Sequence, residues 1–446
     1  MSIVEQAKAE LETLGRANRA FMKIYPGDRA ARQPVHTVYG GAQLYKADTT
    51  RRLGELALRS MKSYARDPDE LARGLGLKLA PAVAEKVYAR VLHKLETEAV
   101  EDFRIDFEDG FGARSDEEED ATAIAAAKEA ARGLAEGILP PFLGIRVKSF
   151  GEEWKLRGAR TFELFFDTLL SATGGKVPEN FVVTLPKITV AEQASTLVRL
   201  FELMEAKHRL PSGTFKMEMM IEVTQALLGP DGRSPLPGFL AACAGRCTGA
   251  HLGTYDFTAS CNITAAYQVM DHWMCDQAKA QMMFAYAGTG VFLSDGATNV
   301  MPVGPHKSPG DATQEDDNRS SVHAAWRLAS RHIRHSLEGG FYQGWDLHPA
   351  QLPVRYATCY AFFLEGFDPA AERLRNFVEK SAQATLVGDV FDDAATGQGL
   401  LNYFLRALNC GAITLDDVAQ TGLTQEEFAL RSFAKILNAR RERLGK

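Results

Sequence analysis

Short apolar runs alternate with longer amphipathic stretches over most of the chain, and this alternation predicts the fold. Helical spacing of apolar residues is found in the stretches between the runs, such as Ala80–Glu96 and Glu118–Glu136. Strands that alternate with helices favour a parallel sheet, and eight strands favour an α/β fold of the (β/α)8 TIM barrel type over a doubly wound sheet. Eight apolar runs have the length and composition of buried strands: Val35–Tyr39, Phe103–Phe107, Leu143–Val147, Phe181–Leu185, Lys216–Val223, Gly249–Thr254, Gly290–Leu293 and Gly344–Leu347.

The pattern becomes purely helical after about residue 355. Asp368 and Pro369 form a typical helix start, a capping residue followed by proline. We therefore expect a barrel domain with an N-terminal helix over residues 1–355, and an all-helical extension over 356–446 that packs over the barrel mouth. The connection 301–321, rich in proline, glycine and charge, is long enough to predict either disorder or a functional loop.

Composition narrows the functional classes. The 446 residues are 46% hydrophobic and 24% charged, as in ordinary globular proteins, with a net charge of −6. A mildly acidic chain lacks the basic surface of a nucleic-acid binder. The six cysteines fit neither a disulfide framework nor a zinc set, and we predict free, buried thiols. Because the chain shows no signal peptide and no long apolar segment, we expect no membrane contact and a cytoplasmic location.

Charged residues interrupt the second predicted strand. With a period of two, Arg104, Asp106 and Glu108 share one face of this strand, and three phenylalanine or isoleucine side chains share the other. Charges inside a barrel are costly unless they are paired or bind a ligand. They predict either a buried ion pair or the wall of an active site.

Other strands end in polar residues as well, and the carboxyl ends of barrel strands are where active sites form. We therefore predict that these residues meet at one rim of the barrel. They are Arg146 and Lys148 after the third strand, Lys187 after the fourth, Glu222 on the fifth, and Gly253, Thr254 and Asp256 at the sixth.

These residue types suit a particular chemistry. Glu222 and Asp256, two carboxylates from separate strands, are expected to bind Mg²⁺ or Mn²⁺, which uses one or two carboxylates and takes its remaining oxygens from water and substrate. A 2-oxo acid can supply two such oxygens. Arg146 is expected to hold its carboxylate, and Gly253 and Thr254 to line its site. A polarised ketone is what an enzyme needs to make or break the adjacent carbon–carbon bond.

The segments that carry these residues resemble one enzyme superfamily, which contains citrate lyase β-subunits, malate synthases and HpcH/HpaI-type 2-oxo-acid aldolases. The similar segments follow the family order between about residues 35 and 355. They are IDFEDGFGARSDEEEDA, GIRVKSF, LPKI, MIEVTQALL, AHLGTYDFTAS and GWDLHPAQL.

The resemblance implies a Mg²⁺-dependent homo-oligomeric enzyme that acts on a 2-oxo acid, often with an acyl-CoA. It places Asp106 and Glu108 beside the metal and its waters. Lys148 and the basic residues after it are candidates for binding CoA phosphates. The segment FDDAATGQ resembles a malate synthase motif, and this resemblance implies that Asp393 acts as a general base. The alternative is that Asp393 only caps the helix that follows it.

Three functions remain open from the sequence. The first is a metal-dependent carbon–carbon lyase, the second a malate-synthase-like acyltransferase that condenses an acyl-CoA with a 2-oxo acid, and the third a non-catalytic binding protein on the same barrel. Lys187 adds a further alternative, because a strand-end lysine can form a Schiff base. We predict instead a protonated Lys187, paired with Asp106 or Glu108.

Overall fold

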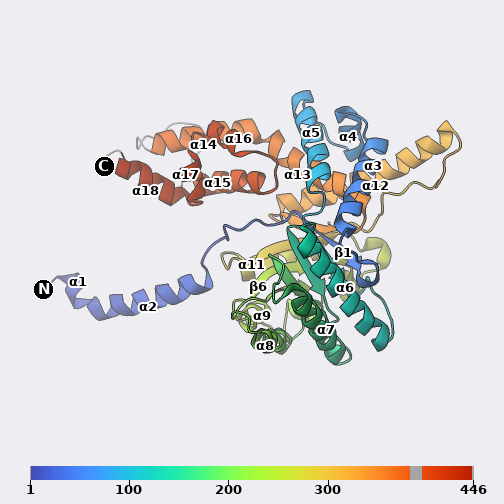
Figure 1. The fold of residues 1–446 in the computed structure, drawn as a ribbon. Helices are drawn as coiled ribbons and strands as arrows, with labels where there is room; N and C mark the ends of the chain where they lie inside the picture. Colours follow the sequence, from blue (N-terminus) through green and yellow to red (C-terminus); the bar gives the residue numbers. More distant parts are fainter. Residues whose placement is uncertain (1, 382–393, 444–446) are drawn as a thin grey trace.

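The computed structural model describes residues 2–381 and 394–443, and its centre is a closed barrel of parallel strands (Figure 1). Each strand pairs in parallel with the next, and β1 pairs with β8 to close the ring. The predicted TIM barrel is therefore confirmed. The strands are β1 (His36–Gly41), β2 (Asp102–Asp106), β3 (Phe142–Arg146), β4 (Phe181–Leu185), β5 (Lys216–Ile221), β6 (Cys247–Leu252), β7 (Phe292–Ala297) and β8 (Gln343–Asp346).

Helices surround the barrel and continue on either side of it. Around the barrel lie α3 (Thr49–Tyr64), α4 (Pro68–Leu75), α5 (Pro81–Thr97), α6 (Asp116–Glu136), α7 (Lys155–Thr173), α8 (Ala191–His208), α9 (Leu236–Ala242), α10 (Thr254–Ser260), α11 (Trp273–Tyr286), α12 (Ala312–Glu338) and α13 (Leu352–Glu365). The N-terminal helices are α1 (Ile3–Gln6) and α2 (Lys8–Ile24), and the extension contains α14 (Phe367–Ser381), α15 (Ala394–Asn409), α16 (Leu415–Val418), α17 (Gln425–Ala429) and α18 (Phe433–Arg443). None of the described helices is long and apolar enough to span a bilayer.

Local sequence explains where these helices begin and end, and α6 is an example. The Ser115 hydroxyl accepts a hydrogen bond from the backbone of Glu118, and acidic residues fill the first turn. Its buried face consists mainly of alanines, which lets α6 pack closely against α7. The helix ends at Gly137, whose φ of 68° is the left-handed conformation that glycine favours.

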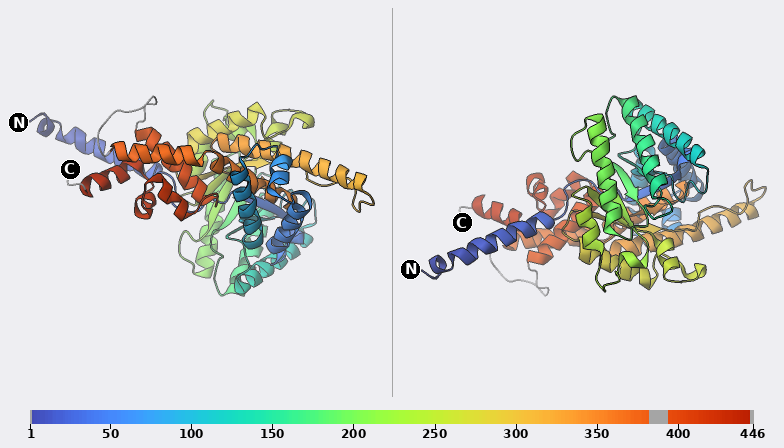
Figure 2. Two further views of the ribbon diagram at one scale, coloured as in Figure 1. Left: turned by 90° about the horizontal axis from the view of Figure 1, so that it is seen from above. Right: turned by 90° about the horizontal axis from the view of Figure 1, so that it is seen from below.

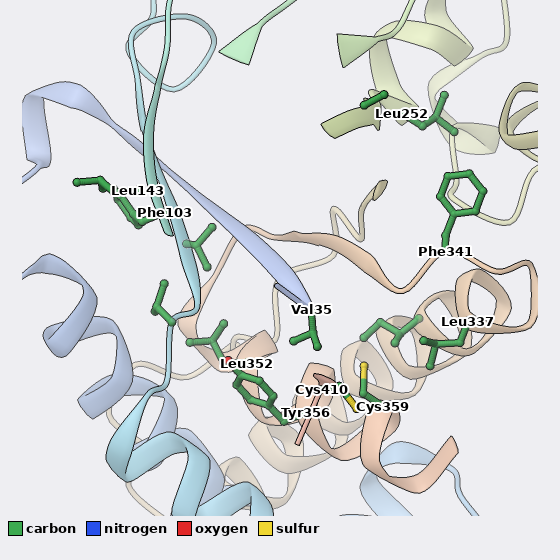
Figure 3. Close-up of a cluster of buried hydrophobic side chains, with 14 of the residues drawn as sticks. Val35, Phe103, Leu143, Leu252, Leu337, Phe341, Leu352, Tyr356, Cys359 and Cys410 are labelled. Carbon is green, nitrogen blue, oxygen red and sulfur yellow. The ribbon is translucent and has the colours of Figure 1, made fainter. Parts of the chain in front are cut away.

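A continuous apolar core joins the barrel to α13 and to the extension. Figure 3 shows Val35 and Phe103 near Leu352 and Tyr356, with Cys359 and Cys410 lying side by side. All six cysteines are free thiols; five are buried and Cys261 is partly exposed. The predicted free thiols are thus confirmed, with Cys261 as the exception to burial.

A buried ionic layer fills the barrel below its mouth. The Arg104 guanidinium pairs with Asp102, and its Nη2 lies 2.8 Å from Oε1 of Glu218. Nε2 of His251 lies 3.2 Å from the same Glu218 carboxylate. The ion-pair interpretation of the charged second strand is therefore correct for Arg104, which belongs to the packed interior.

The extension lies at the amino end of the strands. Gln33 marks this end, because its side-chain amide donates to the carbonyl of Leu293 in β7 (3.1 Å) and to Oε1 of Gln343 in β8 (3.2 Å). From α15, Arg406 donates to Oε1 of Gln33 (2.7 Å), and Asn409 exchanges two hydrogen bonds with the Gln33 backbone.

A second contact holds the extension to the outer helices. Arg90 of α5 lies 2.9 Å from the carboxylate of Asp417 in α16. The described helices of the extension thus contact the amino end of the barrel, and the expectation that they cover the mouth is wrong for them. Figure 2 shows the extension projecting to one side of the barrel. Sequence periodicity shows which helix faces are apolar but not which end of the barrel receives them.

The connection before α12 is shorter than the predicted loop 301–321. The Asp311 side chain accepts a hydrogen bond from the backbone of Gln314 and caps α12, so the helix begins at Ala312. The charged residues after Asp311 belong to a helix, and their polarity reflects exposure and not irregular structure.

Candidate active site

A cavity of about 330 Å³ opens at the carboxyl ends of the strands. This is the rim at which the sequence predicted an active site. Predicted residues that line it are Asp106, Arg146, Glu222, Gly253, Thr254 and Asp256, and further residues that line it include Tyr39, Asp109 and Trp345.

Arg146 on β3 is held rigidly at one wall of this cavity. Its Nε donates to Oδ1 of Asp106 (2.7 Å) and its Nη2 to Oδ2, so the two side chains form a bidentate pair. Its Nη1 lies 2.9 Å from Oε2 of Glu108 and 3.3 Å from Oδ2 of Asp109. The guanidinium also stacks over the Tyr39 ring, 4.8 Å from its centre. The contact with Asp109 is the longest of these three ion pairs, and Asp109 is also the most exposed of the three carboxylates.

Lys187 follows β4 and faces a cluster of carboxylates. Its ammonium lies 2.6 Å from Glu108, 3.3 Å from Asp109 and 3.5 Å from Asp256. Burial alone would lower the pKa of this amine, but Glu108 and Glu222 raise it well above its usual value. The predicted ion pair with Glu108 is confirmed, whereas Asp106 pairs with Arg146 instead.

Glu222, which follows β5, has one satisfied and one unsatisfied oxygen. Its Oε1 accepts a 2.6 Å hydrogen bond from the backbone N–H of Lys187. Its Oε2 is buried and has no hydrogen-bond partner among the described residues. Burial, followed by the nearby Glu108 carboxylate, raises the pKa of Glu222 to about 8. A cation at this oxygen would offset both effects.

The residues after β6 complete the same wall. A side chain on Gly253 would place its Cβ only 2.3 Å from Oε2 of Glu222, so only glycine fits here without displacing the carboxylate. The Thr254 hydroxyl is buried and also lacks a hydrogen-bond partner in the described chain. Asp256 lies in the first turn of α10, and its side chain is 43% exposed.

This donor set fits a magnesium-type ion. Among residues 2–381 and 394–443, no group of three or more histidine, cysteine, aspartate or glutamate side chains is arranged to hold a metal. A Mg²⁺ ion does not need such a group, since it binds through one or two carboxylates and keeps several waters. Oε2 of Glu222, which has no partner among the described residues, and the accessible carboxylate of Asp256 line the same cavity and could serve as two such ligands.

Comparison with known proteins adds a family and a fold. A family model described as "Domain of unknown function (DUF6986)" matches residues 14–436. The chain belongs to this family. No curated protein matches it by sequence.

Among solved structures, the fold of this DUF6986 protein is similar to that of a citrate lyase from Burkholderia xenovorans LB400. The TM-score is 0.53 with 16% sequence identity, over 88% of this chain and 96% of that chain. A Haloferax volcanii malate synthase matches with a TM-score of 0.44 and 14% identity, over 92% and 98% of the two chains. An HpcH/HpaI aldolase from Desulfitobacterium hafniense DCB-2 matches with 0.37 and 12%, over 72% and 90%. The predicted resemblance to this superfamily is confirmed at the level of the fold.

Lys148, the residue predicted to bind CoA phosphates, does not line the cavity of the DUF6986 protein. Lys148 is buried; its ammonium donates to the carbonyl of Phe107 (3.0 Å) and lies 3.2 Å from Glu119. Arg157 and Arg160 both pair with Asp120 of α6. The sequence showed a basic cluster, but the acidic first turns of α6 neutralise it, so Lys148 is not free to bind CoA. The predicted base, Asp393, lies outside the described residues.

Sequence reasoning missed several residues of the cavity, among them Tyr39, Asp109 and Trp345. Tyr39 at the end of β1 has a buried hydroxyl without a hydrogen-bond partner in the described chain, and its ring lies 4.6 Å from that of Trp345. Asp109 contacts both cations of the site. Asp109 and Trp345 stand inside motifs that the resemblance used, while the position of Tyr39 at a strand end was the only signal for it.

Proposed function

We propose that this DUF6986 protein is a divalent-metal-dependent carbon–carbon lyase of the aldolase or citrate lyase type that acts on a 2-oxo acid. The unsatisfied Oε2 of Glu222, buried on the cavity that Asp256 and Arg146 also line, is the observation that carries the proposal. The fold shared with a citrate lyase supports the class of enzyme.

The charges of the site favour an added cation. Around the cavity, the described chain places two cationic side chains, Arg146 and Lys187, among more numerous carboxylates. Glu222 and Asp256 would hold Mg²⁺ or Mn²⁺. When bound, such an ion polarises the substrate ketone and stabilises the negative charge that develops as the adjacent bond breaks.

The residues of the chain bind and orient the substrate. Asp106 fixes Arg146 by two hydrogen bonds and turns its Nη1 toward Glu108 and Asp109. A substrate carboxylate replaces the exposed Asp109 as the partner of Nη1, with little change in the buried Asp106 pair. The unpartnered hydroxyls of Tyr39 and Thr254 are available to donate hydrogen bonds to substrate oxygens.

Lys187 acts as a fixed positive charge in this proposal. Its ammonium offsets the repulsion between Glu108, Asp109 and Asp256, and its backbone orients Glu222. An amine that remains protonated is a poor nucleophile, which argues against a Schiff base.

The acyltransferase alternative has less support from the described residues. It depends on Asp393, which lies outside them, and on a cation for the CoA phosphates, a role for which Lys148 is not free. The lyase is therefore the better supported of the two functions.

A substrate screen tests the proposal. Purified protein is incubated with pyruvate or oxaloacetate, with and without glyoxylate as the aldehyde that accepts the new carbon–carbon bond, with and without acyl-CoAs, in Mg²⁺, Mn²⁺ or excess EDTA. We expect metal-dependent turnover of a 2-oxo acid without CoA. Turnover only with acyl-CoA would favour the acyltransferase, binding without turnover would indicate a binding protein, and full activity in EDTA would contradict the metal.

A further inference from the structure

The N-terminal helix α2 carries an apolar face that nothing in the described chain covers. Neither α1 nor α2 contains a buried residue. Leu14 is 54% exposed, Phe21 62% and Met22 66%. Figures 1 and 2 show α2 projecting from the barrel as a separate arm. Apolar surface of this extent on a water-soluble helix indicates a binding partner.

The apolar residues of α2 form one stripe. Leu11, Leu14 and Phe21 recur at spacings of three and seven residues, which places them on one side of the helix with Asn18 between them. The caps Ala7 and Tyr25 continue the same line at either end. Because packed helices bury such stripes against each other, the partner surface is expected to be apolar and elongated.

The charges of this arm are separated along its axis. Its first half carries Glu5, Glu10 and Glu12 with a single lysine, and its second half carries Arg16, Arg19 and Lys23 with no acidic residue. At 100° per residue, Glu10 lies beside the apolar stripe, whereas Glu12 and the three basic residues of the second half point away from it. Such a helix is complementary to its own antiparallel copy at longer range, since each acidic half then lies along a basic half. A parallel pair would place like charges together and align the two helix dipoles unfavourably.

We propose that α2 is a dimerisation helix that packs antiparallel against the α2 of a second copy of this chain. A two-fold axis then relates the partners, and the same stripe is buried on both. This inference is independent of the proposed function, because α2 contributes no residue to the cavity.

Substitutions in the stripe test the proposal without endangering the fold, since α2 buries nothing within its own chain. We expect the full-length protein, 48.9 kDa per chain, to sediment as a dimer or as a multiple of one. Leu14→Glu and Phe21→Glu should each raise the Kd of this association roughly tenfold or more. Ala20→Glu, which adds the same charge on the opposite side of the helix, is the matched control and should leave the Kd unchanged.

Charge exchange identifies the partner as a second α2. An acidic variant (Arg16→Glu, Arg19→Glu, Lys23→Glu) and a basic variant (Glu5→Lys, Glu10→Lys, Glu12→Lys) should each self-associate more weakly than the wild type, because both arms of a pair then carry a net charge of the same sign. Their mixture should form a heterodimer with restored affinity, and added salt should weaken this heterodimer.

Three results would overturn the proposal. One is a wild-type protein that stays monomeric, and another is an assembly that the stripe substitutions leave intact. The third is a mixture of the two charge variants that shows no rescue, which would mean that α2 docks on another surface, such as the exposed Phe284 of α11. If the protein stays monomeric and floats with anionic vesicles, the partner of α2 is a lipid surface and not a second copy of the chain.

Discussion

The backbone N–H of Lys187 donates a 2.6 Å hydrogen bond to Oε1 of Glu222, whereas the buried Oε2 of Glu222 finds no hydrogen-bond partner among residues 2–381 and 394–443. Lys187 adopts a left-handed φ of 52°, which is costly for a lysine. The conformation aims its N–H at Glu222 while its side chain reaches Glu108, 2.6 Å away. One residue therefore orients the carboxylate that we propose as a metal ligand and balances the charge beside it.

Glu222→Gln should abolish metal-dependent activity. Glutamine keeps the hydrogen bond from Lys187 but binds a hard cation poorly, and metal polarisation contributes several kcal/mol, or roughly 10³-fold in rate. Isothermal titration with Mn²⁺ should show no binding, while the far-UV circular dichroism spectrum stays unchanged. Glu55→Gln on the exposed face of α3 is the control and should retain both binding and activity.

Lys187 should form no covalent adduct with a 2-oxo acid. Its carboxylate neighbours raise its pKa and keep it protonated at neutral pH. Mass spectrometry after incubation with pyruvate and borohydride should therefore find the Lys187 peptide unmodified. The Lys187→Arg variant measures background labelling at other lysines, and an adduct lost only in that variant would contradict the prediction.

Arg146→Lys should raise the KM for the 2-oxo acid by roughly 10- to 100-fold. A lysine can replace the charge but neither the bidentate bond to Asp106 nor the bond to a planar carboxylate, and a charged hydrogen bond is worth about 1.5–3 kcal/mol. Steady-state kinetics at saturating metal measure the change. Arg160→Lys, on the outer surface of α7, is the matched control, and an equal effect there would rule out a specific role for Arg146.

Asp417→Asn should weaken the attachment of the extension in a pH-dependent way. Burial opposes ionisation of this carboxyl, but hydrogen bonds from the Thr414 backbone and Arg90 lower its pKa to about 2, below the usual 3.8. Its contribution, about 1–2 kcal/mol, is present above pH 3.8 and is lost as the pH falls toward 2.

Urea unfolding measures this contribution. The wild type should be more stable than Asp417→Asn at pH 6, and the difference should shrink at pH 3. Asp416→Asn, one residue away and exposed, should behave as the wild type at both values. A difference that does not change with pH would show that the carboxylate charge is irrelevant.

Asp393→Asn separates the two roles that the sequence left open for this residue. Asparagine caps helices well, so a structural role predicts normal turnover. General base catalysis predicts a fall in kcat of roughly 10²–10⁴-fold, with binding of metal and 2-oxo acid intact. Normal turnover would remove the main support for a malate-synthase-like reaction.

The sequence was most informative about the barrel and its rim. Strands covered on both faces read as short apolar runs, so seven of the eight β-strands were predicted to within about two residues, while β7 ends four residues beyond its prediction. Charges at the strand ends located Arg146 and Glu222. Tertiary partners were not predictable. Arg104 and Lys148 are charged residues on predicted strands, as the residues of the cavity are, so the sequence alone could not separate the two groups. In the structure, Arg104 pairs with Glu218 and Lys148 with Glu119, partners that are distant in sequence. The attachment of α15 through Gln33 likewise depends on residues that no periodic pattern connects.

The attachment of the extension at the amino end of the barrel has a practical consequence. Figure 1 shows the extension, with α18 at its far end, projecting from the barrel, and α15 contacts the amino end of the strands. A fusion partner or surface linkage placed after α18 would therefore be attached away from the cavity, which opens at the carboxyl ends. Immobilised through its C-terminus, the protein would turn Arg146 and Glu222 toward bulk solution. Diffusing small molecules would therefore reach tethered copies as readily as free ones.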